Sequence, residues 1–590
     1  MTHPLQLPFR SRLLNRVISR VIGLRPLIRI YDSWLESKRN GELPVGGQLL
    51  DHALTQLEAD IVWGDKSAWK TIPPDGPLIV VANHPLGGLE GMLMTRELLR
   101  RRSDTKVLTN ELLSRFPEFD DLFIGLDVLS GNAASKNTRG IREACKHLAA
   151  GGALLIFPAG TVAGIRIGSL RIEDGQWNKL VGWLARRYRT ACMPVHLDAR
   201  NGAGFYLAGL VHKRLRTLLL PRELANKKNF IVRATAGELL TRREIAQLGD
   251  SASITSFLRL STEMLAPKSG GKTSLAGNRL EVAIAPNIAA TKLQVQIEKL
   301  EPFRLVDSGV YAVYCAPYDA MGCVMGQIAV DREVTFRAVD EGTGRELDSD
   351  NFDPYYWHLW VWHKQNNEIV GAYRVGKTDE ILRDHGIDCL YSRSLYQFDE
   401  SFIGQIGGAI EVGRSFVTLT YQRQPKALDL LWRGIGAFMV KNPSYHTLFG
   451  PVSISRQYST LARAFLADAM MTNFSVRPEW QRNVRPQSPL HVRGKLWTPE
   501  ILASLGNVAV INKLLGNLDR GKRIPILLRH YLALNGRFAS FTVNKGFNDS
   551  LDGLILVDLR EAPDKYLNRY LGKEGRQSFL NRWNEKSRAA

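Results

Sequence analysis

His84 and Glu90 are the first side chains in this sequence whose types and spacing could do chemistry. A neutral imidazole can take a proton from an attacking hydroxyl near neutral pH, and a carboxylate beside it would fix the ring tautomer and stabilise the imidazolium. The two can meet only if Gly87 and Gly88, which lie between them, bend the chain back. The alternative is an ordinary loop histidine beside a carboxylate at the start of a helix.

A strand and a helix must position this pair. The β-branched run 78–82 predicts a buried strand, and residues 92–101 predict a helix after a turn that contains proline and two glycines. His84 then lies at the carboxyl end of a strand, where α/β sheets commonly bind ligands. Because helix and strand patterns alternate over residues 45–265, the sequence predicts an α/β domain. Its further strands are expected at 106–109, 153–157 and 191–196.

A second turn with chemical potential follows the strand predicted at 153–157. Proline and glycine force a turn at 157–161, and such a turn exposes backbone N–H groups that could bind a phosphate or an oxyanion. The substrate-binding or donor-binding residues expected in this domain are Asn83, Gly87, Gly88, Phe157, Pro158, Gly160 and Thr161.

The run Asn-His-Pro-Leu-Gly-Gly-Leu-Glu-Gly at 83–91 resembles the first motif of the glycerolipid acyltransferase superfamily, in its hemolysin-like branch. The resemblance implies that His84 and Glu90 are a catalytic dyad, with one residue more between them than in the wider superfamily and Glu in place of the usual Asp. Residues 157–161 are similar to the motif Phe-Pro-Glu-Gly-Thr, with Ala159 in place of Glu. No arginine stands at 125–132, where that superfamily binds phosphate, which implies an acceptor without phosphate.

Composition limits the remaining possibilities. With 590 residues and 44% hydrophobic content, the chain is long enough for two globular domains. Its five cysteines are scattered without a CxxC pair, which argues against a disulfide framework or a structural zinc site and favours a reducing cytoplasm. A net charge of +20 predicts an anionic partner: a phospholipid surface, an acidic carrier protein or a nucleic acid. No nucleic-acid motif supports the last.

The amino-terminal segment, residues 1–44, favours a membrane surface. Apolar residues recur there at helical spacing, and arginines recur every four residues from Arg12 to Arg20. Such a helix can lie on an anionic bilayer, with Tyr31 and Trp34 as interface anchors, and residues 210–224 mix leucines with basic side chains in the same way. We therefore expect a peripheral protein on the cytoplasmic face of a bacterial inner membrane. The alternative is a helix packed on its own domain.

The second half of the chain has a different pattern. Residues 266–279 are small, polar and rich in glycine, which is typical of a flexible linker. Closely spaced strands with few long helices follow, and this order predicts an α+β acyl-transfer fold. The strands are expected at 356–363, 368–375, 409–419 and 447–454, with a helix at 427–440.

The run 408–417, which contains Glu411-Val-Gly-Arg414, resembles the central strand of GNAT-superfamily N-acyltransferases that use acyl carrier protein thioesters, including the ornithine N-acyltransferases. Glu411 could act as the base for an attacking amine, and Arg414 could bind a carboxylate or the donor phosphate. Gly413 could mark a bulge that frees an N–H group for the thioester carbonyl. The alternative is a cross-strand ion pair.

The loop after this strand, residues 422–427, is basic but has no glycine. Arg423 and Lys426 are therefore expected to bind the single phosphate of a carrier-protein arm, which favours acyl carrier protein over coenzyme A as the donor. No metal or other cofactor is expected, since a thioester is already activated.

A chain that carries both motifs, one in each half, resembles the bifunctional ornithine-lipid synthases, in which the two acyltransferase domains are fused. This implies that residues 280–560 acylate the α-amine of ornithine with a 3-hydroxyacyl group and that residues 45–265 esterify the hydroxyl of the resulting lyso-ornithine lipid. Residues 561–590 would be a basic tail. The alternatives are a lysophospholipid acyltransferase, a synthase of a glycine, lysine or glutamine lipid, and a basic membrane or nucleic-acid binder without enzyme activity.

Overall fold

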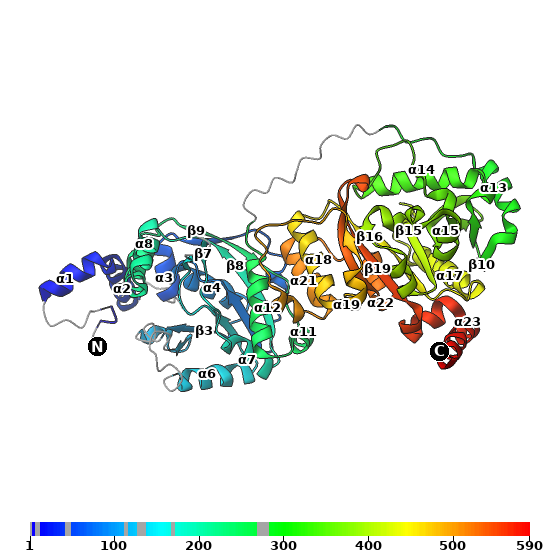
Figure 1. Ribbon diagram of the computed structural model, residues 1–590. Helices are drawn as coiled ribbons and strands as arrows, with labels where there is room; N and C mark the ends of the chain where they lie inside the picture. The colour runs from blue at the N-terminus through cyan, green and yellow to red at the C-terminus, as the bar shows by residue number, and fades with distance from the viewer. Residues whose placement is uncertain are drawn as a thin grey trace. The chain divides into compact units, whose positions relative to one another are not determined.

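The computed structural model describes residues 3–5, 12–41, 49–110, 116–126, 137–166, 171–267 and 282–589, and the statements on structure below refer to these residues. The stretch 127–132 and most of the predicted linker lie outside them. The chain divides into two compact units, Met1–Gly270 with Leu496–Leu518, and Gly271–Lys495 with Asp519–Ala590 (Figure 1).

The first unit is built on a seven-stranded sheet in the order β1-β9-β8-β2-β5-β3-β4. Neighbouring strands run parallel except for β8 and β9. All five residues of β2 are fully buried, which explains the continuous apolar run that predicted it. The predicted strands are all present, with ends within two residues. The strands of this sheet are β1 (Asp60–Trp63), β2 (Leu78–Ala82), β3 (Thr105–Asn110), β4 (Phe123–Leu126), β5 (Ala153–Ile156), β8 (Ala191–Asp198) and β9 (Ile231–Ala236).

Helices cover this sheet, as Figure 1 shows for α4, α6 and α12. They are α3 (Leu49–Gln56), α4 (Leu89–Leu99), α6 (Thr138–Ala149), α7 (Leu180–Arg187), α11 (Arg242–Gln247) and α12 (Ser251–Glu263). Between β5 and β9 the chain also forms a hairpin and three short helices that lie near the end of β2. These are β6 (Gly164–Arg166), β7 (Arg171–Glu173), α8 (Ala203–Val211), α9 (Lys213–Leu218) and α10 (Leu220–Ala225).

The amino-terminal segment forms two helices, α1 (Arg12–Val21) and α2 (Leu24–Arg39), on either side of Gly23. Tyr31 and Trp34 stack with their ring centroids 6.0 Å apart and are buried in the core of the unit. The prediction that they anchor the protein in a membrane interface is therefore wrong, because this face of α2 packs inward. None of the described helices combines the length and the apolar character that crossing a bilayer requires.

Residues 496–518 belong to the first unit although they come late in the chain. They form α20 (Pro499–Ala503) and α21 (Val508–Leu518). The ammonium of Lys513 lies 2.6 Å from a carboxylate oxygen of Glu244, and the apolar residues Ile511, Leu514 and Leu515 are fully buried. The second unit is therefore not the continuous range 280–560 that the sequence pattern suggests.

The second unit is built on an eight-stranded sheet in the order β10-β11-β12-β13-β15-β16-β19-β18, in which β15 and β16 are parallel and the other pairs antiparallel. Its strands are β10 (Arg304–Ser308), β11 (Tyr311–Pro317), β12 (Trp357–His363), β13 (Glu368–Lys377), β15 (Ala409–Val417), β16 (Thr447–Ile454), β18 (Arg537–Asn544) and β19 (Ser550–Asp558). β14 (Tyr396–Gln397) and β17 (Arg485–Pro486) form a separate small sheet.

Two long helices lie on opposite faces of this sheet. Ile328 of α14 shares a core cluster with Ala312 of β11, whereas Gly434 of α17 faces the next residue, Val313. A Cβ on Gly434 would lie 2.6 Å from a methyl group of Val313, so this glycine lets the helix approach the strand closely. The helices of the unit are α13 (Ala290–Lys299), α14 (Cys323–Ala338), α15 (Thr378–His385), α16 (Glu400–Ile406), α17 (Pro425–Lys441), α18 (Thr460–Asn473), α19 (Pro478–Arg482), α22 (Ile526–Ala533) and α23 (Asp564–Ala589).

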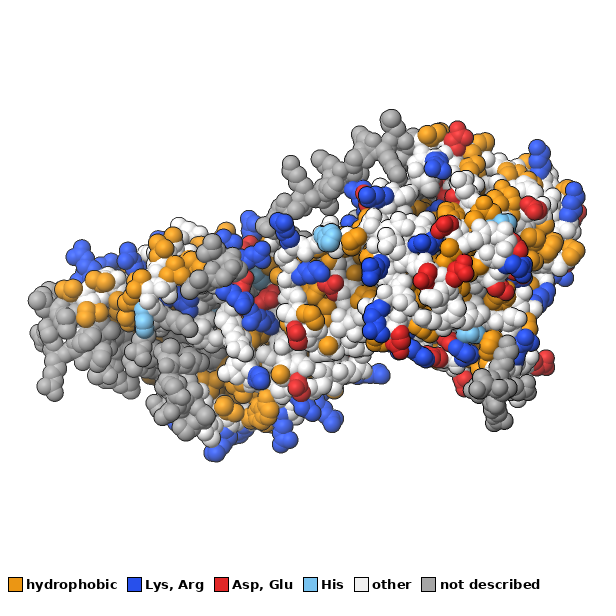
Figure 2. Space-filling model, in the orientation of Figure 1, with side chains coloured by type: hydrophobic (Ala, Val, Ile, Leu, Met, Phe, Trp, Pro, Cys, Tyr) orange, Lys and Arg blue, Asp and Glu red, His pale blue; other side chains and the backbone are white. Residues whose placement is uncertain are grey.

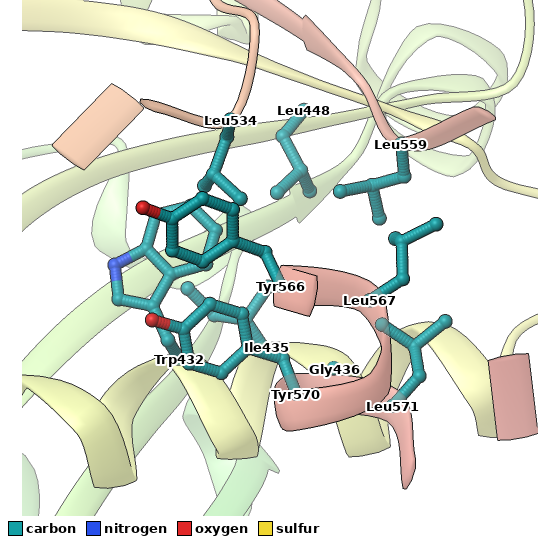
Figure 3. A pocket seen from close by; sticks show the side chains of 10 residues that line it. All are labelled: Trp432, Ile435, Gly436, Leu448, Leu534, Leu559, Tyr566, Leu567, Tyr570 and Leu571. Atoms are coloured by element: carbon teal, nitrogen blue, oxygen red, sulfur yellow. The ribbon is translucent and has the colours of Figure 1, made fainter. Parts of the chain in front are cut away.

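The predicted basic tail is the helix α23, which kinks at Gly572 and packs on α17. Figure 3 shows the hollow between these helices, where Trp432, Tyr566 and Tyr570 gather. Its volume of about 10 Å³ is room for about one water molecule, and its lining is apolar. It is a packing gap in the core, and α23 is a structural element of the second unit.

Candidate active sites

The end of β2 brings His84 and Glu90 together. The Nδ1 atom of His84 lies 3.0 Å from Oε1 of Glu90, which stands in the first turn of α4. The Glu90 side chain is fully buried, whereas 17% of the His84 side chain is exposed. The imidazole is therefore open to a ligand on one side and held by a carboxylate on the other.

The carboxylate is fixed by the turn that precedes it. Oε1 of Glu90 accepts hydrogen bonds from the backbone N–H groups of Leu86, at 2.9 Å, and Gly87, at 2.7 Å. Burial alone would raise the pKa of Glu90, but these donors and His84 hold it below its ordinary value. Gly87 has φ +108°, and a Cβ there would lie 2.8 Å from Leu220. Gly87 and Gly88 thus shape the loop, and the backbone N–H of Gly87 is used by Glu90 rather than by a ligand.

The turn at 157–161 lies beside the histidine. The ring of Phe157 is 4.8 Å from the ring of His84, and Gly160, at φ +64°, donates its N–H to the Phe157 carbonyl. The Pro158 carbonyl accepts a hydrogen bond from the backbone N–H of Asn178, and the Thr161 side chain is exposed. The structure therefore brings the two predicted motifs of this unit to one place.

The side chain of Asn83 has a structural role. Its side-chain amide donates to the Leu197 carbonyl at 3.0 Å and accepts from the Leu197 N–H at 2.7 Å. Both ends of the amide thus join the end of β2 to β8, and the predicted contact of Asn83 with substrate stays a prediction. It extends the sheet and thereby fixes the position of His84.

Two residues that sequence reasoning missed also hold this loop. Asp174 accepts a hydrogen bond from the backbone N–H of His84 at 3.1 Å, and burial raises its pKa although this donor and Trp177 oppose the rise. Asn201 donates to the carbonyls of residues 85–86. Both come from segments far along the chain, and no local pattern marks them.

In the second unit, Glu411 is buried in β15. Its Oε1 accepts from the Ser392 N–H at 2.6 Å, and its Oε2 accepts from the Tyr391 N–H at 3.2 Å and from the hydroxyl of Tyr356. Burial raises the pKa of Glu411, although the hydrogen bonds from Ser392 and Tyr356 oppose the rise. Because protein donors occupy both oxygens, Glu411 does not offer a free oxygen to an attacking amine, and its role as the base, directly or through water, stays a prediction. Glu411 positions the backbone at 391–392.

The predicted bulge in β15 is present, but it centres on Arg414 rather than on Gly413. Arg414 has φ +46°, and the register with β13 shifts there. Its guanidinium lies 3.0 Å from Asp350 and 3.5 Å from Asp348. Burial alone would lower the pKa of Arg414, but the negative charges near it, Asp348 first and then Asp350, raise this pKa above its ordinary value. Arg414 thus pairs with protein carboxylates through Nη2, and its role toward a donor phosphate stays a prediction.

A buried ionic network continues behind Arg414. Arg374 lies 2.6 Å from Asp350 and 3.3 Å from Asp353, and Arg332 lies 3.0 Å from Asp353. Burial alone would raise the pKa of Asp353, but Arg332 and Arg374 hold it well below its ordinary value. The spacing Asp-x-Asp-x-x-Asp at 348–353 is the sequence signal that could have indicated this network.

A cavity of about 470 Å³ opens in front of the network. Asp348, Asp350 and Arg414 line it, together with Tyr391, Ser394, Leu395 and the chain at 542–546.

Arg423 and Lys426 do not line this cavity. Lys426 lies 4.9 Å from the ring centroid of Tyr311, and Arg423 is exposed in the loop before α17. The structure therefore does not bring these two predicted donor-binding residues together with Arg414.

Comparisons with known proteins match both parts of the chain. A family model described as "Acyltransferase" matches residues 61–269, and one described as "Acetyltransferase (GNAT) domain" matches residues 332–433. The glycine N(alpha)-acyltransferase of Phocaeicola vulgatus is 30% identical over 297 residues, which cover 48% of this chain and 90% of that protein. The chain is a member of this acyltransferase family.

Two further relatives divide between the halves of the chain. The glycine N(alpha)-acyltransferase of Bacteroides thetaiotaomicron is 29% identical over 297 residues, covering 48% of this chain and 87% of that protein. The lyso-glycine lipid O-acyltransferase of Phocaeicola vulgatus is 25% identical over 176 residues, covering 29% of this chain and 58% of that protein. The predicted fold class, an α/β acyltransferase domain followed by a GNAT domain, is confirmed, and so is the prediction of an enzyme that transfers acyl groups.

The first site of this acyltransferase is suited to activating a hydroxyl. Because Nδ1 of His84 faces the ionised Glu90, the favoured tautomer carries its proton on Nδ1 and leaves Nε2 as the acceptor. Nε2 can then take the proton of an alcohol as it attacks a thioester, while Glu90 stabilises the imidazolium that forms.

Proposed function

We propose that this enzyme makes a doubly acylated amino-acid lipid. The second unit joins an acyl group to the amine of an amino acid, and the first unit then esterifies a hydroxyl of that product. The observation that carries this proposal is that relatives named for an N-acyltransferase and for a lyso-lipid O-acyltransferase match one chain. The two reactions are consecutive, since a lyso-lipid is a product of the first and the acceptor of the second.

Each proposed step fits the chemistry of its site. The imidazole and carboxylate pair of the first unit suits an alcohol, which must lose a proton as it attacks. A 3-hydroxyacyl group on the amine would supply that alcohol. The second unit carries charged side chains around a cavity large enough for an amino acid and the end of a thioester.

Ornithine is our first candidate for the amino-acid acceptor, since the resemblance of the run 408–417 to ornithine N-acyltransferases implies it. Glycine is the second candidate, because both N-acyltransferase relatives carry glycine in their names. Supplying the two amino acids separately distinguishes them.

We propose acyl carrier protein as the acyl donor. Arg423 stands in the loop before α17 and Lys426 in the first turn of that helix, and both are exposed to an approaching partner. A net charge of +20 favours association with an acidic carrier. Both steps use an activated thioester and need base, positioning and oxyanion stabilisation from the protein.

We propose that the first unit works at the surface of an anionic membrane on the cytoplasmic face. Figure 2 shows hydrophobic side chains gathered over α8. Leu207, Leu210 and Val211 of this helix are 50% to 79% exposed, and Leu215 and Leu218 of α9 are exposed as well. Since Leu220, just beyond them, packs on Gly87 of the active loop, a lipid acceptor reaching these helices would be close to His84.

The test is expression of the chain in a host that lacks aminolipids, followed by lipid extraction and mass spectrometry. We expect a diacylated amino-acid lipid that contains one amide and one ester. Purified protein that turns over lysophosphatidic acid, and no amino acid, would instead identify a lysophospholipid acyltransferase. Protein that binds liposomes and consumes no acyl thioester would show that the chain is not an enzyme of this class.

A further inference from the structure

The cavity of the second unit has one carboxylate whose bonding capacity is incomplete. Asp348 lines the cavity and its side chain is 1% exposed. Its Oδ1 lies 3.5 Å from the guanidinium of Arg414, and its Oδ2 is buried without a hydrogen-bond partner. A buried acceptor without a partner is costly unless something binds it, so this atom points to a ligand that donates.

The other carboxylates near the cavity are already satisfied. Asp350 binds Arg374 through Oδ1 and Arg414 through Oδ2, at 2.6 Å and 3.0 Å. Both oxygens of Glu411 accept from backbone N–H groups. Among the described carboxylates that line the cavity, Asp348 therefore has the oxygen available to a substrate.

We propose that this cavity is the acceptor site for a primary ammonium group and that Asp348 binds the ammonium and takes its proton. The proposal rests on the N-acyl transfer proposed above and names the residue that serves it. Arg345, which is exposed and lines the same cavity, supplies a cation for the carboxylate of an amino acid. The ligand class is thus an amino acid with a free α-amine.

The charge balance of the site suits this role. Burial raises the pKa of Asp348 although Arg414 opposes the rise, so the carboxylate holds a proton more readily than an exposed one. The guanidinium of Arg414, 3.5 Å from Oδ1, favours the charged form of Asp348, which is the form that binds an ammonium. Glu411, which holds the backbone of Tyr391 and Ser392 at the cavity wall, acts as a positioning residue.

The step balances without a further reactant. One N–H proton of the ammonium passes to Oδ2 of Asp348, and the freed electron pair of nitrogen forms a bond to the thioester carbonyl carbon. The C–S bond then breaks, and the departing thiolate takes the second proton lost by nitrogen. Asp348 afterwards returns its proton to solvent, and the products are an amide and a thiol.

The experiment compares Asp348→Asn with the wild-type full chain over a pH range of about 6 to 10, with an acyl thioester donor and ornithine or glycine as acceptor. Amide formation and thiol release are both measured. We expect a loss of about 100-fold or more near pH 7. The loss should shrink as the pH rises, because the free amine becomes abundant and no longer needs a base.

Asp331→Asn is the matched control. Asp331 is partly buried, burial raises its pKa to about 7, and it does not line the cavity, so this variant should keep the wild-type rate and pH profile. Asp348→Glu, which keeps a carboxylate, should retain more activity than Asp348→Asn.

Three outcomes are decisive. A loss in Asp348→Asn that is equal at every pH would overturn the proposal, because a misfolded cavity lowers the rate without changing its pH dependence. An unchanged rate would overturn it as well. If the wild-type protein itself forms no amide with either amino acid while its first unit still acylates a lyso-lipid, the proposed N-acyl transfer fails instead.

Discussion

Nδ1 of His84 lies 3.0 Å from Oε1 of Glu90 across a loop in which that same oxygen also accepts two backbone N–H groups. The carboxylate thus holds both the ring and the turn that carries the ring. Five residues separate the pair, and Gly87 with its positive φ makes this longer loop close on itself.

Replacing His84 should separate the two proposed reactions. We expect His84→Ala to lower ester formation by about 100-fold or more, because the alcohol loses its base, while amide formation continues. The mono-acylated amino-acid lipid should then accumulate in whole-cell lipid extracts. Glu90→Gln should also lower ester formation, since a neutral amide cannot stabilise the imidazolium. Diacylated lipid at the wild-type level in His84→Ala would contradict the assignment.

The two loop glycines offer a matched pair. In Gly87→Ala the new Cβ would lie 2.8 Å from Leu220 at a backbone φ of +108°, which costs about 1–3 kcal/mol and displaces the N–H that Glu90 accepts. In Gly88→Ala the nearest atom is 3.4 Å away and φ is negative. We expect a large loss of O-acylation in Gly87→Ala and a small one in Gly88→Ala, measured as ester formed on a supplied lyso-lipid. Equal effects would show that the loop shape does not matter.

Glu411→Gln should act on the second unit through its structure. A glutamine oxygen can accept from the Ser392 N–H, but its NH₂ group cannot accept from the Tyr356 hydroxyl, which leaves a buried donor without its acceptor at a cost of about 1–3 kcal/mol. We expect a lower unfolding midpoint and slower amide formation with an unchanged pH profile. A rate defect that disappears at high pH would instead identify Glu411 as the base.

The sequence could predict the features that neighbouring residues determine. The strands that hold His84 and Glu411 follow from apolar runs, and the pair His84 and Glu90 from spacing within one loop. Asp174 and Asn201 hold that loop from distant segments, so no pattern near His84 could indicate them. Glu411 resembled a base by motif, but its burial depends on the chain at 391–392, which only tertiary structure brings there.

The partly buried histidine His196 should make the free energy of unfolding depend on pH. It lies in β8 with an unpartnered Nδ1, and burial lowers its pKa to about 4, although Asp198 opposes this. The unfolded chain takes up the proton at about pH 6.5, whereas the folded protein resists it down to about 4, so acid favours unfolding between these values. Between pH 7 and pH 5 this group should lower the free energy of unfolding by roughly 2 kcal/mol.

Urea unfolding at pH 7 and pH 5 checks this expectation. His196→Gln removes the titrating group, so its unfolding midpoint should fall less between the two pH values than that of the wild type. His385→Gln, on the exposed end of α15, is the control and should follow the wild type. An equal fall in all three proteins would show that His196 does not contribute.

The segment 496–518 should determine whether the second unit can be produced as a separate soluble protein. Ile511, Leu514 and Leu515 of α21 are fully buried and belong to the first unit, where Lys513 also pairs with Glu244. A protein of residues 282–590 alone would expose these side chains to water, at about 1.5–3 kcal/mol each. We expect it to aggregate in size-exclusion chromatography and to bind a hydrophobic dye. Replacing 496–518 by a short Gly-Ser linker should restore a monodisperse second unit, because this removes the uncovered apolar face while leaving the eight-stranded sheet intact. A soluble, dye-free fragment that still contains α21 would contradict the placement of this helix.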